Sequence, residues 1–182
     1  TCGTIGAALG CAFAMSQTPS QLKATLSAAA TSAAGFLEIQ EDSSELKPYN
    51  VSNAAMSAVM ASYVGQTGKK GADDILGGNR GFIKLLCEDI NMDKLVGVSD
   101  DYEIQRIYVK LYAACRHCHP AIEAAIKISE QHKVAPCDIN SIRVATYQLA
   151  IKGHDHKDIC GEQSAKLSIP YSVAVAYKYQ SV

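Results

Sequence analysis

Reactive side chains are concentrated in residues 115–119, which read Cys-Arg-His-Cys-His. The spacing C-x-x-C-H is the attachment pattern of c-type haem, in which two thiols bond the vinyl groups and the histidine ligates iron. The pattern is short, however, and haem attachment goes with export, whereas no basic residue precedes the first apolar stretch. We therefore do not favour a haem protein.

A zinc site is the second metal interpretation of this stretch. Cys115 and Cys118 supply two thiolates, and His154, His156 or Cys160 would complete a tetrahedral site. The separation between Cys118 and His154 is too long for a compact zinc knuckle, so only the fold can bring these groups together. We expect a site without metal.

The interpretation without metal places the same residues at the start of a helix. His119 followed by Pro120 is typical of a helix N-terminus. The free N–H groups of such a terminus attract anions, and the guanidinium of Arg116 can bind a carboxylate through two hydrogen bonds. Residues 115–119 therefore predict a carboxylate-binding site, in which His117 assists.

Composition excludes several classes of protein. The 182 residues are 48 % hydrophobic and 19 % charged, which is enough to bury a core. The formal net charge of -1 and a longest basic run of only Lys69-Lys70 argue against a nucleic-acid partner. The apolar stretch before Lys23 is interrupted at Pro19, so we expect neither a signal peptide nor a membrane span. Seven cysteines, several in apolar surroundings, predict a reducing, cytoplasmic compartment.

The first half of the chain consists of small residues at helical spacing. Helices are predicted at residues 4–15, 18–35 and 53–64; the second opens with Thr-Pro-Ser-Gln, which combines an N-cap, an N1 proline and a capping box. Residues 77–81 predict a turn rather than a phosphate-binding loop, because the GxxxxGK[ST] pattern is absent. Thr1 stands inside an apolar helical pattern without a cap, as if the chain were cut from a longer protein.

The hydrophobic period changes near residue 100. Residues 104–111 and 142–148 alternate and are rich in β-branched and aromatic side chains, which predicts two strands. Helices are predicted at residues 119–132 and 164–179, with Pro170 as a kink or late start. We therefore expect two domains: an all-helical domain at 1–100 and an α/β domain at 101–182 with the order strand-helix-strand-helix.

Five longer motifs lie along the chain. They are TCGTIGAA at residues 1–8, KPYNVSNAA at 47–55, ILGGNRGF at 75–82, KLYAACRHCHPAIEAA at 110–125 and AKLSIPYSVAVA at 165–176. The fourth resembles the signature K-P-Y-x-x-C-R-x-x-H-x-A-I-D-A-A of the MmgE/PrpD family. The others resemble motifs of the same family, in the same order, so the resemblance covers nearly the whole chain.

This resemblance implies a fold and a chemistry. The fold is a large all-helical domain with a smaller α/β lid, in relatives that extend before the position of Thr1 and beyond that of Val182. The family includes 2-methylcitrate dehydratase, cis-aconitate decarboxylase and iminodisuccinate epimerase, which break a C–H or C–C bond beside a carboxylate without an iron–sulfur cluster. Such chemistry needs a base, an acid and fixed positive charge. Family habit also implies a homodimer.

Motif positions imply roles for four residues, because the resemblance makes Lys47, Lys110, His119 and Tyr171 catalytic. Arg116 and His117 are predicted to bind the substrate. A lysine holds a carboxylate as a point charge or, when desolvated, transfers a proton, and a tyrosine can relay one. Structural alternatives are solvent-facing lysines, a capping histidine and a core tyrosine; residues 154–156 are expected to form a solvated turn.

Three functions remain open. The first, which we favour, is a metal-independent, cofactor-free lyase of the 2-methylcitrate or citrate dehydratase kind, acting on a small di- or tricarboxylate. The second is an isomerase or epimerase of a dicarboxylate such as iminodisuccinate, which uses the same proton abstraction. The third is a catalytically inactive fragment of such an enzyme.

Overall fold

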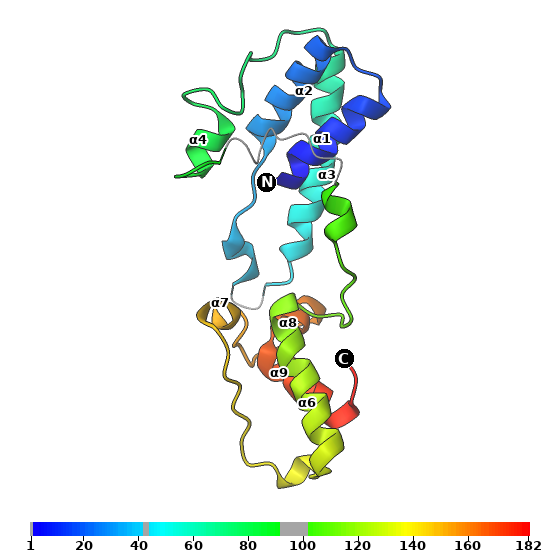
Figure 1. The fold of residues 1–182 in the computed structure, drawn as a ribbon, viewed down its shortest axis with the longest axis vertical. Helices are drawn as coiled ribbons and strands as arrows, with labels where there is room; N and C mark the ends of the chain where they lie inside the picture. The colour runs from blue at the N-terminus through cyan, green and yellow to red at the C-terminus, as the bar shows by residue number, and fades with distance from the viewer. Residues whose placement is uncertain (1, 42–43, 92–101) are drawn as a thin grey trace. The chain divides into compact units, whose positions relative to one another are not determined.

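The computed structural model describes residues 2–41, 44–91 and 102–182 (Figure 1). The chain divides into two compact units, which are described separately. Unit 1 comprises Thr1–Phe36 and Pro48–Tyr102, and unit 2 comprises Leu37–Lys47 and Glu103–Val182. The domain boundary expected near residue 100 falls outside the described residues.

Unit 1 is built from three main helices, α1 (Cys2–Ala14), α2 (Pro19–Ser32) and α3 (Lys47–Gln66), with a short α4 (Phe82–Leu86). The predicted capping box opens α2: the Thr18 N–H donates to Gln21 Oε1 at 2.9 Å, and the Gln21 N–H donates back to Thr18 Oγ1 at 3.4 Å. α3 begins at Lys47, earlier than the predicted start at residue 53. Pro48 lies in its first turn, where the missing N–H costs no helical hydrogen bond.

Small side chains let these helices approach closely. Ala8, Ala29, Ala58 and Ala61 form the core of unit 1. A Cβ on Gly65 of α3 would stand 2.0 Å from Thr25 Oγ1. A contact of this closeness requires glycine at position 65, whereas an added Cβ at Gly3, Gly6 or Gly10 of α1 would meet nothing within 4 Å.

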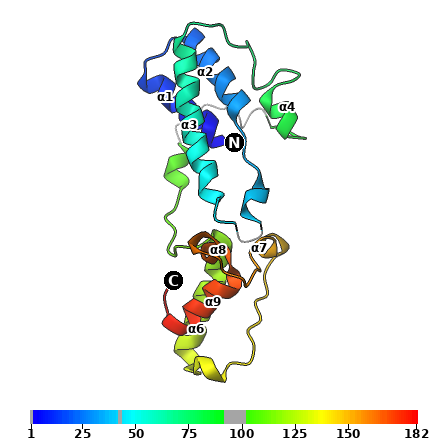
Figure 2. The same ribbon diagram turned by 180° about the vertical axis from the view of Figure 1, so that it is seen from behind.

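Unit 2 is centred on α6 (His119–His132) and α9 (Ile169–Tyr179), which lie side by side in both views (Figures 1 and 2). Their facing sides bury Cys118, Ile122, Ala125, Val173 and Ala176. The remaining short helices are η1 (Leu37–Gln40), η2 (Glu103–Arg106), η3 (Arg116–Cys118), η4 (Pro136–Asp138), α7 (Gln148–Ile151) and α8 (Glu162–Leu167). The prediction of a helix over 119–132 is confirmed.

The two predicted strands of unit 2 are wrong. Glu103–Arg106 forms a 3-10 helix, and residues 139–147 are irregular before α7 begins at Gln148. Alternation of apolar and polar residues indicates an extended segment with one apolar side. A strand also needs a neighbouring backbone with which to form hydrogen bonds. Among the described residues no such pairing occurs, so the described part of unit 2 is helical rather than α/β.

The helix predicted at 164–179 is two helices, α8 and α9, divided at Ser168. Pro170 lies in the first turn of α9, and the Ser168 Oγ caps this turn by accepting the Tyr171 N–H at 3.1 Å. The late start of the helix is therefore confirmed. In the described part of the chain, no helix combines the length and the apolar character needed to cross a membrane.

Candidate active site

A pocket of about 630 Å³ in unit 2 collects three lysines. We call it the lysine pocket; its described lining residues are Lys47, Lys110, Leu111, Tyr112, Ala113, Ala114, Cys115, Gln163, Lys166, Leu167 and Val182. None of these side chains is acidic. A pocket lined by several ammonium groups attracts small anions, and carboxylates above all.

Backbone hydrogen bonds position the lysines of this pocket. The Cys115 N–H donates to the carbonyl of Lys166 at 2.7 Å, which ties the segment that carries Lys110 to α8. The Lys110 Nζ itself donates to the carbonyl of Ala114 at 3.4 Å. The pocket wall is therefore an irregular segment held against a short helix rather than a strand edge.

Glu45 ties the segment before Lys47 to the opposite end of α8. Its carboxylate accepts the N–H of Gln163 at 3.0 Å and that of Ser164 at 2.9 Å, so it caps the helix from a distant part of the chain. These N–H groups lower the pKa of Glu45. A Cβ on Gly161 would stand 2.8 Å from the Glu45 carboxyl carbon, so the glycine leaves room for this cap.

Substituting Gly161 with alanine should therefore displace the cap. Because the methyl group would overlap the Glu45 carboxylate, we expect both hydrogen bonds to break and the amides of α8 to exchange faster in hydrogen–deuterium exchange mass spectrometry. The lowered pKa of Glu45 means that its contribution is present above about pH 4.5 and is lost as the pH falls through the folded-state pKa. Wild-type α8 should lose protection in that acid range, whereas Gly161→Ala should have little left to lose.

Gly10→Ala is the matched control for this substitution, because a Cβ there meets nothing within 4 Å. It should leave the exchange of α8 unchanged. Equal protection of α8 in wild type and Gly161→Ala would contradict the capping role of Glu45.

His119 lies behind the lysine pocket rather than in its lining. The side chain is buried, its Nε2 lies 3.3 Å from the carbonyl of Ala114, and its ring meets the Tyr112 ring edge-on at 5.2 Å. Because a carbonyl only accepts, Nε2 carries the proton in this contact. The Ala114 carbonyl thus joins His119 to Lys110.

Three residues predicted for the site do not line the lysine pocket. Arg116 is exposed and lies 5.5 Å from the centre of the Tyr108 ring. His117 contacts the Tyr147 hydroxyl through Nδ1 at 2.5 Å. Tyr171 is 42 % exposed in the first turn of α9. The structure therefore brings Lys47 and Lys110 together and places Arg116, His117 and Tyr171 elsewhere.

Cys115 and Cys118, considered above as metal ligands, differ in their surroundings. Cys115 is half-buried and lines the lysine pocket, whereas Cys118 is fully buried, with Sγ 3.9 Å from the Leu167 carbonyl. Burial, followed by the neighbouring Cys115, raises the pKa of Cys118 to about 11, so the thiol stays protonated near neutral pH. Within the described ranges, no group of three or more His, Cys, Asp or Glu side chains is arranged to hold a metal ion.

His154 was missed by sequence reasoning, which expected a solvated turn there. Its side chain is only 5 % exposed, Nδ1 donates to the Lys152 carbonyl at 2.8 Å, and the ring lies 5.2 Å from that of His117. The buried Nε2 has no hydrogen-bond partner among the described residues. Burial lowers its pKa, the hydrogen bond to Lys152 raises it, and the nearby His117 and Lys47 lower it; the net shift is downward, which favours the neutral imidazole.

The pH dependence of stability should reveal the buried His154. An unfolded histidine takes up a proton near pH 6.5, whereas folded His154 does so only at lower pH, so its contribution to stability is lost as the pH falls below about 6.5. His154→Asn keeps an N–H donor for Lys152 but cannot titrate. We expect its free energy of unfolding in urea to vary less between about pH 7 and pH 5 than that of the wild type.

The exposed His132 provides the control for this experiment. His132→Asn should keep the wild-type pH dependence. If His154→Asn kept it as well, burial of the neutral imidazole would not be linked to folding.

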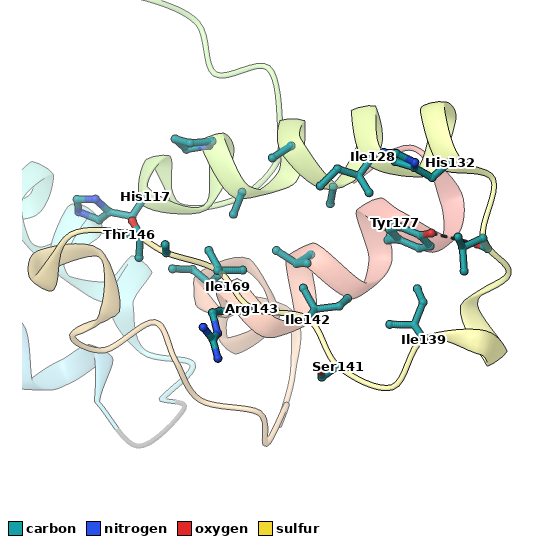
Figure 3. A pocket seen from close by; sticks show the side chains of 18 residues that line it. His117, Ile128, His132, Ile139, Ser141, Ile142, Arg143, Thr146, Ile169 and Tyr177 are labelled. Carbon is teal, nitrogen blue, oxygen red and sulfur yellow. Dashed lines mark hydrogen bonds between the residues drawn. The ribbon is translucent and has the colours of Figure 1, made fainter.

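A second hollow, of about 540 Å³, lies between α6, residues 139–146 and α9 (Figure 3). In the close view, Ile139 and Ile142 point towards α6 and α9, whereas Ser141 and Arg143 point away from them. The alternation that predicted a strand here therefore marks the side of the segment that faces the hollow, where Ile142 is still 51 % exposed and Val144 38 %. Apart from His117 at one end, none of the predicted site residues lines this hollow.

Comparison with protein families covers most of the chain. Residues 1–94 match the MmgE/PrpD N-terminal domain, and residues 112–182 match the MmgE/PrpD C-terminal domain. The chain belongs to the MmgE/PrpD family. This confirms the resemblance found in the five motifs. A search of curated proteins finds no match.

The two MmgE/PrpD matches contribute unequally to the lysine pocket. Lys47 lies in the N-terminal match, and Cys115, Gln163 and Lys166 lie in the C-terminal match. Lys110 lies between the two matches, near the end of the interval 95–111. Membership in this family, which includes hydro-lyases, supports a lyase-like enzyme in general terms.

Proposed function

We propose that this protein is a metal-independent lyase that removes water from a small di- or tricarboxylate of the citrate or 2-methylcitrate kind. The observation that carries the proposal is the lysine pocket, in which Lys47 and Lys110 line one cavity together with a third lysine and no acidic side chain among the described lining. Family membership supports the same class of reaction. A small polycarboxylate is the ligand that this charge favours.

The chemistry follows from the charges in the pocket. One ammonium group holds a substrate carboxylate and stabilises the enediolate-like anion that develops when the neighbouring C–H bond breaks. The other lysine acts as the base that takes that proton. The C=C bond forms as the C–O bond breaks, and the proton passes from the lysine to the departing hydroxyl, which leaves as water.

His119 acts on this reaction as a positioning residue. Its bond to the Ala114 carbonyl fixes the peptide segment from which Lys110 reaches the same carbonyl. The His119 side chain is buried and does not line the pocket, so we assign it no proton transfer. Likewise we assign no step to Tyr171, because its place in the first turn of α9 does not line the pocket.

Proton NMR in deuterated buffer tests the proposed reaction. Citrate, 2-methylcitrate, cis-aconitate and iminodisuccinate are incubated separately with the purified protein. Loss of water from citrate or 2-methylcitrate is the expected result. Exchange of an α-proton of iminodisuccinate without loss of water would instead identify an epimerase, and no change in any of the four would overturn the enzyme proposal for this chain.

A further inference from the structure

Lys166 is the lysine of the pocket to which neither the motifs nor the proposed reaction gives a role. It lies on α8, and its side chain is 38 % exposed, compared with 62 % for Lys127 on α6. Both lysines make an ion pair with a glutamate four residues earlier, Glu162 for Lys166 and Glu123 for Lys127. Only Lys166 also lines the pocket, so an ion pair on a helix surface does not account for its position.

The helix that carries Lys166 is connected to both of the other lysine-bearing segments. At its N-terminal end, the Gln163 and Ser164 N–H groups bind Glu45, two residues before Lys47. At Lys166 itself, the backbone carbonyl accepts the N–H of Cys115, near Lys110. Five or fewer residues separate each lysine from these bonds, so α8 fixes the place of the third cation relative to the other two.

The charges around Lys166 favour an anionic ligand. Glu162 is the carboxylate that pairs with it, and the Glu45 carboxylate is engaged by backbone N–H groups. Neither glutamate lines the pocket, where the described charged side chains are three lysines. A cavity lined by several lysines, with no acidic side chain among its described lining, attracts a ligand with several carboxylates.

We propose that Lys166 is a third carboxylate-binding residue, which makes the pocket prefer ligands with three carboxylates over ligands with two. This inference rests on the proposed function and specifies how its site selects among substrates. Lys47 and Lys110 contact the part of the ligand that both kinds share. Lys166 binds the additional one, and the Glu162 carboxylate exchanges its partner for solvent when the ligand arrives.

Two unreactive ligands isolate this preference from catalysis. Tricarballylate and glutarate share a three-carbon chain with a carboxylate at each end, and only tricarballylate carries a third carboxylate on the central carbon. Neither has a hydroxyl group to lose, so binding is measured by isothermal titration calorimetry without turnover. The wild type should bind tricarballylate at least about 10-fold more tightly than glutarate, the effect of one additional charged hydrogen bond.

Lys166→Gln should remove this preference. We expect it to weaken tricarballylate binding by about 10- to 100-fold and to change glutarate binding little. Lys127→Gln, which removes the matching ion pair on α6, should leave both affinities as in the wild type. Glu162→Gln breaks the Lys166 ion pair but keeps the lysine, so it should retain or strengthen the preference.

The outcomes separate Lys166 from the rest of the site. The proposal is overturned if the wild type shows no preference, if Lys166→Gln keeps it, if both ligands weaken equally, or if Glu162→Gln loses the preference like Lys166→Gln. Water loss from citrate together with an unchanged preference in Lys166→Gln would leave the proposed lyase standing and remove only Lys166. If the preference for tricarballylate depends on Lys166 but the protein turns over no substrate, the role of Lys166 would stand and the proposed lyase would be removed.

Discussion

Replacing Lys110 by methionine is expected to lower kcat/KM for the dehydrated substrate by about 100- to 1,000-fold, and Lys47→Met should cause a loss of the same order. Methionine keeps an unbranched apolar stem and removes only the ammonium group. One lysine is proposed to stabilise charge that develops in the transition state and the other to take the proton, so loss of either should lower kcat as well as weaken binding. Initial rates of water loss by proton NMR provide the measurement.

Lys127→Met is the control for both variants. Lys127 is exposed on α6, pairs with Glu123 at 2.8 Å and does not line the lysine pocket. Its replacement should leave the rate unchanged. Wild-type rates in both Lys47→Met and Lys110→Met would place the chemistry outside the lysine pocket, and a comparable loss in Lys127→Met would indicate a general effect of charge.

Helix starts were the part of the fold that local sequence could predict. The capping residues Thr18 and Gln21 and the prolines at 19, 120 and 170 act within one turn of their helices, so their effect can be read from neighbouring residues. Strand formation depends instead on a partner that may lie anywhere in the chain. Residues 139–147 show this: Ile139 and Ile142 point towards α6 and α9, yet the described residues provide no pairing backbone.

The candidate site could be predicted only in part, for the same reason. Lys47 and Lys110 came from motif positions in the family, because nothing in their local sequence distinguishes them from solvent-facing lysines. The bond from Glu45 to Gln163 joins residues 118 positions apart. His154 lies in a polar run, so its burial follows from packing and not from hydropathy.

Ile122→Ala is expected to cause the largest loss of stability in unit 2, about 2–5 kcal/mol. Ile122 is fully buried in the α6 and α9 core, beside Cys118 and Val173. Truncation removes its transfer free energy and leaves a cavity, because helices held by many other contacts relax only in part. Urea denaturation monitored by circular dichroism gives the free energy, and hydrogen–deuterium exchange of α6 assigns the loss to unit 2.

The same core supports the candidate site, so this substitution also tests how the site is built. Ile128→Ala, on the same helix but 49 % exposed, is the matched control and should cost far less. Ile122 does not line the lysine pocket. Folded Ile122→Ala should therefore keep its activity at temperatures below its unfolding transition. A cost equal to that of Ile128→Ala would mean that the contact between α6 and α9 does not hold unit 2 together, and the position of α8 beside Lys110 would then need another explanation.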